Sequence, residues 1–89
     1  MSATIHEGDA LAILRTLPSD HYHGSLTARY LARLILPPIP DARMLTPFSG
    51  SGSEVIGALQ AGWSHVDGID SWDVAVRISR ARIAHWSAK

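Results

Sequence analysis

The sequence predicts an α/β fold with a small, mainly parallel sheet. Short apolar segments alternate with segments of helical periodicity, and a glycine-rich turn over 49–53 separates one apolar run from the helical pattern after it. A second apolar segment ends in Gly68-Ile69-Asp70 before the last helical pattern begins. Strands that alternate with helices favour parallel pairing, because each helix returns the chain to the end of the sheet where the next strand starts.

The first half of the chain is expected to form a strand over 3–7 and, after the Gly8-Asp9 turn, a short helix that runs through Leu17. A loop, a second helix and a connector are expected over 18–24, 25–36 and 39–43. Pro37 and Pro38 end the second helix, because proline lacks the amide donor that a helix needs.

The second half is expected to form a strand, a helix, a strand and a helix over 44–48, 53–61, 65–69 and 72–86, with the first strand beginning a residue or two earlier. Gly62 ends the first of these helices, and Trp63 closes that end against the sheet. One broad face of the last helix carries Trp72, Ala75, Val76, Ser79, Ile83 and Trp86. Arg82 intrudes on that face, where its stem is expected to lie along apolar surface or a tryptophan ring.

The glycine-rich turn has the composition of a ligand-binding loop. Gly50 and Gly52 allow a left-handed backbone and close approach of a ligand, and Ser51 or Ser53 is expected to cap the next helix. The pattern lacks the third glycine of a dinucleotide fingerprint and the lysine of a phosphate-binding loop. It favours a nucleoside with a short charged tail over a pyrophosphate ligand, and a turn that only joins strand to helix is the alternative.

Two aspartates stand where a ligand contact or a helix cap is expected, and the residues alone favour a ligand contact only for Asp70. Asp70 follows the glycines by about twenty residues, the spacing at which a carboxylate accepts hydrogen bonds from ribose hydroxyls. A cap or turn residue before the last helix is the alternative for Asp70. Asp9 precedes a short helical pattern and fits the N-cap position of that helix.

Residues 46–52, Thr-Pro-Phe-Ser-Gly-Ser-Gly, resemble the Asp-Pro-Phe-x-Gly-Ser-Gly motif of the DNA methyltransferases that modify the exocyclic amino groups of adenine (N6) or cytosine (N4). Residues 58–83 are similar to that family's helix, second strand and following helix. Residues 26–35 and 5–11 resemble the helix before the motif and the opening strand with its Gly-Asp turn in permuted members, where the catalytic region precedes the glycine motif. The resemblance extends over nearly the whole chain.

The resemblance implies a partial Rossmann-like methyltransferase fold and S-adenosyl-L-methionine as cofactor. It implies one domain over 1–89, with an opening strand and helix in 1–20 and the cofactor-binding part in 25–89. Asp70 would accept from the ribose, Asp9 from the adenine amino group, and Trp72 would lie against the adenine. The expected cofactor-binding residues are Asp9, Thr46, Pro47, Phe48, Ser49, Gly50, Ser51, Gly52, Asp70 and Trp72.

The chain also departs from the family. It has no Asp-Pro-Pro-Tyr motif, which holds the flipped target base, and no target-recognition region. Thr46 stands where the family has an acidic residue. We interpret the chain as a truncated or internally deleted methyltransferase with no catalytic residue of its own, so that the isolated chain is inactive. The alternatives are a non-catalytic module that binds S-adenosylmethionine or a partner, and one half of a split enzyme.

Composition bounds the remaining possibilities. The chain has 89 residues, 46% of them hydrophobic and 18% charged, which fits one small globular domain. It has no cysteine, and His21 and His23 lack a nearby third ligand, so no disulfide or metal site is expected.

The formal net charge is zero, which makes DNA a weak partner for this chain alone. The arginine pairs Arg29–Arg33 and Arg77–Arg80 are read as solvated helix faces. The other expected partners are a complementing polypeptide or a second copy, through an unpaired sheet edge. The sequence shows no signal peptide and no apolar run of membrane-spanning length, which predicts a cytoplasmic protein.

Overall fold

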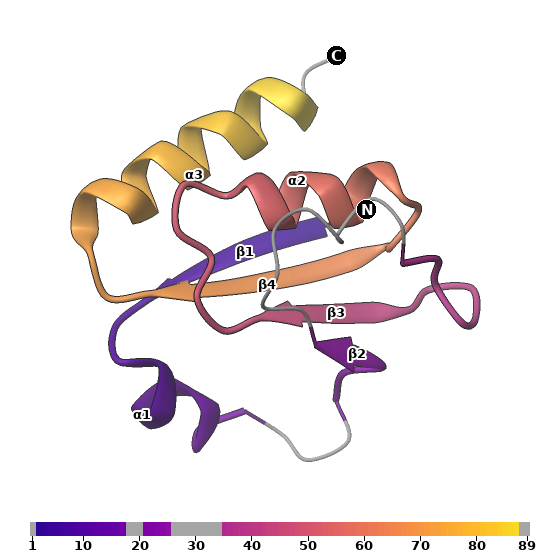
Figure 1. Cartoon of the computed structure of the whole chain (residues 1–89), viewed down its shortest axis with the longest axis horizontal. Helices are drawn as coiled ribbons and strands as arrows, with labels where there is room; N and C mark the ends of the chain where they lie inside the picture. Colours follow the sequence, from indigo (N-terminus) through magenta and orange to yellow (C-terminus); the bar gives the residue numbers. More distant parts are fainter. Residues whose placement is uncertain (1, 18–20, 26–34, 88–89) are drawn as a thin grey trace.

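Four strands form one sheet in the order β1-β4-β3-β2 (Figure 1). The computed structural model describes residues 2–17, 21–25 and 35–87. The strands are β1 (Ser2–Glu7), β2 (Gly24–Ser25), β3 (Arg43–Thr46) and β4 (His65–Asp70). All pairings among them are parallel, and β1 matches β4 from Ser2↔His65 to Glu7↔Asp70. The predicted α/β fold with a small parallel sheet is confirmed.

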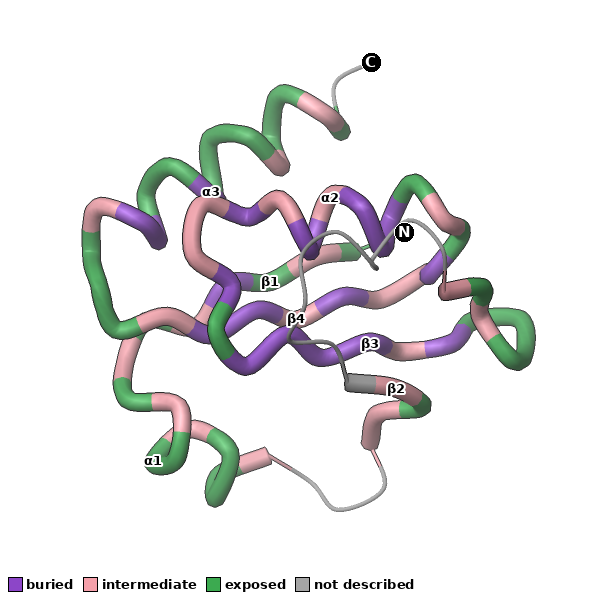
Figure 2. Tube along the Cα trace, viewed as in Figure 1, coloured by how far each residue is buried: buried purple, intermediate pink, exposed green. Residues whose placement is uncertain are grey.

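Two helices, α2 (Ser53–Gln60) and α3 (Asp73–Ser87), pack on the same face of the sheet, while the short α1 (Ala10–Leu14) follows β1 at the carboxyl edge. The core lies between the sheet and these two helices (Figure 2). Its buried apolar side chains are Ile5, Ala42, Met44, Val55, Ala58, Leu59, Trp63, Val66 and Val76. Alternate residues of each strand supply this face, as the two-residue repeat of a strand requires.

The predicted core face of the last helix is confirmed except at Trp72, which precedes α3 and is largely exposed. Ala75, Val76 and Ser79 are buried on α3, and Ile83 and Trp86 pack against the core at its edge. The prediction for Trp63 is also confirmed. Its side chain is only 1% exposed, and its ring Nε1 donates a hydrogen bond of 2.8 Å to the Ile35 carbonyl.

Several predicted ends are corrected. The first helix stops at Leu14 instead of Leu17, because the amides of Thr16 and Leu17 bond to carbonyls three residues back and tighten the chain into turns. Strand β3 ends at Thr46 instead of Phe48, since Pro47 offers no amide to continue the ladder. Gly62 ends α2 as predicted, with a left-handed φ of 105°.

The predicted helix over 25–36 is wrong at both described ends, and 26–34 lie outside the described residues. Ser25 belongs to β2, where Gly24–Ser25 pair with Met44 and Leu45 of β3. Leu36 is not helical, and it precedes Pro37, whose ring disfavours the helical conformation of the residue before it. Within the described ranges, no helix is long and apolar enough to cross a bilayer.

Gly68 on β4 lies directly against Ser49 of the loop that follows β3. A Cβ at residue 68 would lie 2.7 Å from the Cβ of Ser49 and 2.9 Å from Cδ1 of Ile5. We expect Gly68→Ala to lower the free energy of unfolding by about 1–3 kcal/mol, because both neighbours belong to the packed core and must shift.

Urea unfolding measures this loss, with Gly50→Asn as the control. Gly50 has open space around its missing Cβ and a φ of 54°, which asparagine tolerates. An equal loss in the two variants would show that crowding at Gly68 is not the cause.

Candidate ligand-binding site

A cavity of about 180 Å³ lies at the carboxyl ends of three parallel strands. Its lining comes from the segments after β1 and β3 and from the end of β4, and comprises Gly8, Asp9, Ala10, Pro47, Phe48, Asp70 and Ser71. Ligands of open α/β sheets bind in crevices at this edge. The fold therefore brings together four residues that the sequence singled out from distant segments, namely Asp9, Pro47, Phe48 and Asp70.

Asp70 lies at the junction of the cavity and the surrounding turns. Its Oδ2 accepts a hydrogen bond of 2.8 Å from the Gly50 amide, and its Oδ1 accepts one of 2.9 Å from the Trp72 amide. A carboxylate offers about four acceptor positions, so two remain for the hydroxyls of a ligand. The turn-residue role of Asp70 is thus present in the structure, and it leaves room for the ligand role.

Asp9 has the same double character. It is the N-cap of α1, where its Oδ2 accepts a 3.0 Å hydrogen bond from the Ala12 amide, and it also lines the cavity. Asp9 and Asp70 are the charged residues among the described lining of the cavity. Their carboxylates give the cavity a negative potential that favours a positively charged ligand.

The glycine loop, residues 47–52, has the predicted left-handed glycines, with φ of 54° at Gly50 and 90° at Gly52. Gly52 is the N-cap of α2, and no side chain caps that helix, so the predicted cap by Ser51 or Ser53 is wrong. A Cβ on Gly52 would lie 3.1 Å from the Ser79 side chain. Glycine is needed there because the loop packs directly against α3.

The other predicted loop residues do not belong to the described lining of the cavity. Thr46 is buried and its hydroxyl donates to the Asp67 carbonyl at 3.4 Å. Ser49 is also buried, and its amide donates to the Ile69 carbonyl at 2.8 Å. The residues of the predicted set outside the described cavity lining are Thr46, Ser49, Gly50, Ser51, Gly52 and Trp72.

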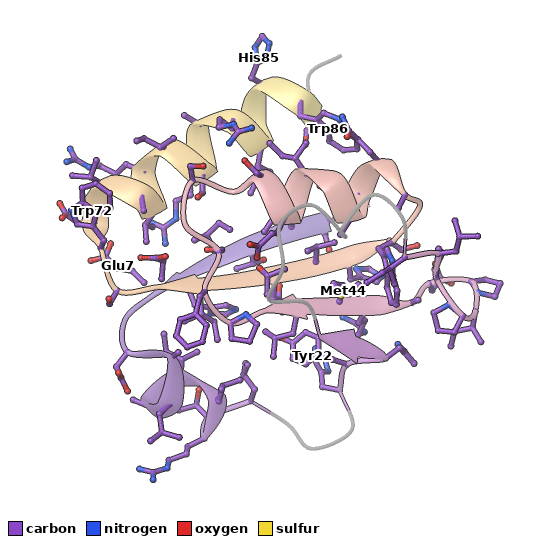
Figure 3. The ribbon with its side chains drawn as sticks, in the orientation of Figure 1. Glu7, Tyr22, Met44, Trp72, His85 and Trp86 are labelled. Atoms are coloured by element: carbon purple, nitrogen blue, oxygen red, sulfur yellow. The ribbon has the colours of Figure 1, made fainter. Side chains whose placement is uncertain are left out.

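Two aromatic side chains stand on the surface at this edge. Phe48 on the cavity wall is 67% exposed, and Trp72 is 62% exposed. Figure 3 places Trp72 at the turn between β4 and α3, above Glu7 at the end of β1. Exposed aromatic rings beside a carboxylate are suited to stacking on a flat or cationic ligand.

A second polar cluster lies on the sheet face opposite α2 and α3, and the sequence did not reveal it. The Tyr22 hydroxyl donates to Oδ2 of Asp67, and Nε2 of His6 lies 3.9 Å from the same oxygen. Burial and the Asp67 carboxylate raise the pKa of Tyr22 above its usual value. Strand alternation puts His6 and Asp67 on one face, but only the β1–β4 register shows that they are near one another.

No group of three metal-ligating side chains occurs in the described part of the chain. No protein-family model, curated protein or solved structure matches this chain.

The Tyr22–Asp67 hydrogen bond predicts a loss of stability at alkaline pH. A folded-state pKa above the unfolded value of about 10 means that the bond stabilises the fold fully below that pH. As the pH rises further, the Tyr22 hydroxyl loses its proton in the unfolded chain before it does so in the folded protein. The contribution of the hydrogen bond to the free energy of unfolding therefore declines. We expect Tyr22→Phe to cost about 1 kcal/mol at pH 8, and the difference from wild type to shrink above pH 10.

Urea unfolding of both proteins between pH 8 and 11 checks this prediction. The second tyrosine, Tyr30, is present in both proteins and cancels in the comparison. A difference that stays constant over this range would contradict it.

Proposed function

We propose that the chain binds S-adenosyl-L-methionine and descends from the adenine-N6 or cytosine-N4 DNA methyltransferases, with a partial Rossmann-like methyltransferase fold. One observation carries the proposal, namely that Asp9, Pro47, Phe48 and Asp70 line a single cavity. These residues come from three of the four segments in which the sequence resembles that family. Their meeting at the carboxyl edge of a parallel sheet is the arrangement that a nucleoside cofactor requires.

The charge of the cavity supports the same ligand, and its size limits how much of that ligand it encloses. S-adenosylmethionine carries a sulfonium and an ammonium group, and the described cavity lining carries the two carboxylates of Asp9 and Asp70. The cavity of about 180 Å³ is smaller than the ~300 Å³ at which typical small-molecule sites begin. The ligand would therefore place one part in the cavity and extend over exposed surface, where Phe48 and Trp72 lie.

The proposed function stops at binding for the isolated chain. Chemistry on a base requires a pocket that holds the base outside the duplex, and the sequence lacks the Asp-Pro-Pro-Tyr motif that forms it in the family. A non-catalytic binding module is therefore the form that we propose for this chain alone.

A split methyltransferase is the second candidate, and the outer position of β2 favours it. Among the described residues, Gly24–Ser25 pair with Met44 and Leu45 of β3, and β2 is the outer strand on this side of the sheet. A complementing polypeptide that supplies the catalytic strand would extend the sheet here, and DNA would be the substrate of the assembled enzyme.

Calorimetric titration with S-adenosylmethionine tests the binding proposal. We expect micromolar affinity for wild type and at least tenfold weaker binding for Asp70→Asn, because the amide replaces one acceptor oxygen with a donor. Asparagine keeps one oxygen for the amides of Gly50 or Trp72, so this variant disturbs the loop less than alanine would.

Asp41→Asn is the matched control, since Asp41 is exposed before the amino end of β3, and its φ of 59° suits asparagine. Absence of binding by a folded wild-type sample would show that the glycine loop is only a connection. Tighter binding of NAD than of S-adenosylmethionine would favour a dinucleotide site instead.

The isolated chain is expected to transfer no methyl group to DNA. Mixed-sequence duplex incubated with labelled S-adenosylmethionine should stay at the background of a protein-free reaction. Label incorporation that disappears with Asp70→Asn would refute this expectation and show that the chain holds the target base by other residues.

A further inference from the structure

Helix α3 holds the glycine loop through two side chains. The Ser79 hydroxyl donates a 2.7 Å hydrogen bond to the Gly50 carbonyl, and Ser79 is fully buried. Nη1 of Arg82 donates to the Ser51 carbonyl at 2.9 Å and lies 3.3 Å and 3.1 Å from the hydroxyls of Ser51 and Ser53. Neither Ser79 nor Arg82 belongs to the described lining of the cavity.

These contacts fix two successive peptide planes. A trans peptide directs its carbonyl and the next amide to opposite sides, and the described chain has no cis peptide. Because the carbonyls of Gly50 and Ser51 face α3, the amides of Ser51 and Gly52 point away from it. The Gly52 amide donates within the loop to Ser49 at 3.0 Å, and the Gly50 amide donates to Asp70 at 2.8 Å.

We infer that Arg82, supported by Ser79, is a positioning residue of the proposed ligand site. It keeps the glycine loop in its binding conformation from outside the cavity. The expected effect of Arg82 on ligand binding rests on the proposed function. Its effect on the conformation of the glycine loop does not depend on any ligand. Two left-handed glycines leave the free loop many other conformations, so a ligand that meets a released loop must also order it.

The chemistry of arginine suits this role. Its planar guanidinium reaches oxygens of two residues from one nitrogen, whereas a lysine ammonium is a compact charge on a flexible stem. Arg77 on the same helix is the matched control. It is exposed, and its Nη2 donates to the Asp73 carboxylate at 3.5 Å, one turn earlier on α3.

The test compares two ligands and three variants. Calorimetry measures S-adenosylmethionine and adenosine against wild type, Arg82→Ala, Arg82→Lys and Arg77→Ala. Adenosine lacks the charged methionine tail, which we expect to lie along the glycine loop, since Pro47 and Phe48 of this loop line the cavity. We expect Arg82→Ala to weaken S-adenosylmethionine about tenfold and adenosine less than twofold, with partial recovery in Arg82→Lys and no change in Arg77→Ala.

Hydrogen exchange of the ligand-free proteins provides the second readout. The amides of residues 50–53 should exchange faster in Arg82→Ala than in wild type, while those of β4 stay unchanged. Equal weakening of both ligands, or unchanged affinity for S-adenosylmethionine, would overturn the positioning role. If wild type binds neither ligand, the proposed function fails, and faster or unchanged exchange at 50–53 still decides whether Arg82 holds the loop.

Discussion

The carboxyl edge of the sheet depends on the hydrogen bonds that the Asp70 carboxylate accepts. This carboxylate accepts one amide from the glycine loop and one from the turn into α3, so the end of β4 fixes both connections. Hydrogen bonds to a charged acceptor contribute about 1.5–3 kcal/mol each, more than neutral ones. Ser79 and Arg82 then bind the same loop from α3, and the loop is held from two sides.

This arrangement means that the structural roles and the proposed ligand roles coincide in the same side chains. Asp9 caps α1 and lines the cavity, and Asp70 joins two turns and lines it too. For each residue the sequence left a structural and a functional interpretation open, and a carboxylate has enough acceptor positions for both. A loss of binding on truncation of Asp70 would mix the two roles, whereas exchange of one oxygen for an amide separates them better.

Local signals in the sequence were enough for much of the fold. The order of β1, α1, β3, α2, β4 and α3, the Gly62 helix end and most of the buried face of α3 follow from periodicity and glycine chemistry, which act within a few residues. The position of the cavity also follows from the predicted fold, because the carboxyl ends of parallel strands meet at one edge of the sheet. The two-residue β2, the Tyr22–Asp67 contact and the contacts of Arg82 with Ser51 and Ser53 join distant segments, and no local pattern encodes them. Arg82 was expected to lie along apolar surface, but the serine oxygens of the loop offer its guanidinium hydrogen bonds that apolar surface lacks.

The two edges of the sheet are not equally open to an added strand. The amides of Ser2 and Gly8 donate toward β4, so the even residues of β1 pair inward and the Ile5 carbonyl faces the outer edge. Arg80 of α3 donates to that carbonyl at 2.9 Å and covers part of the edge. A charged side chain on an edge strand disfavours pairing with another chain. Self-association through β1 is thereby disfavoured, and among the described strands β2 is the side to which the proposed complementing strand would be added.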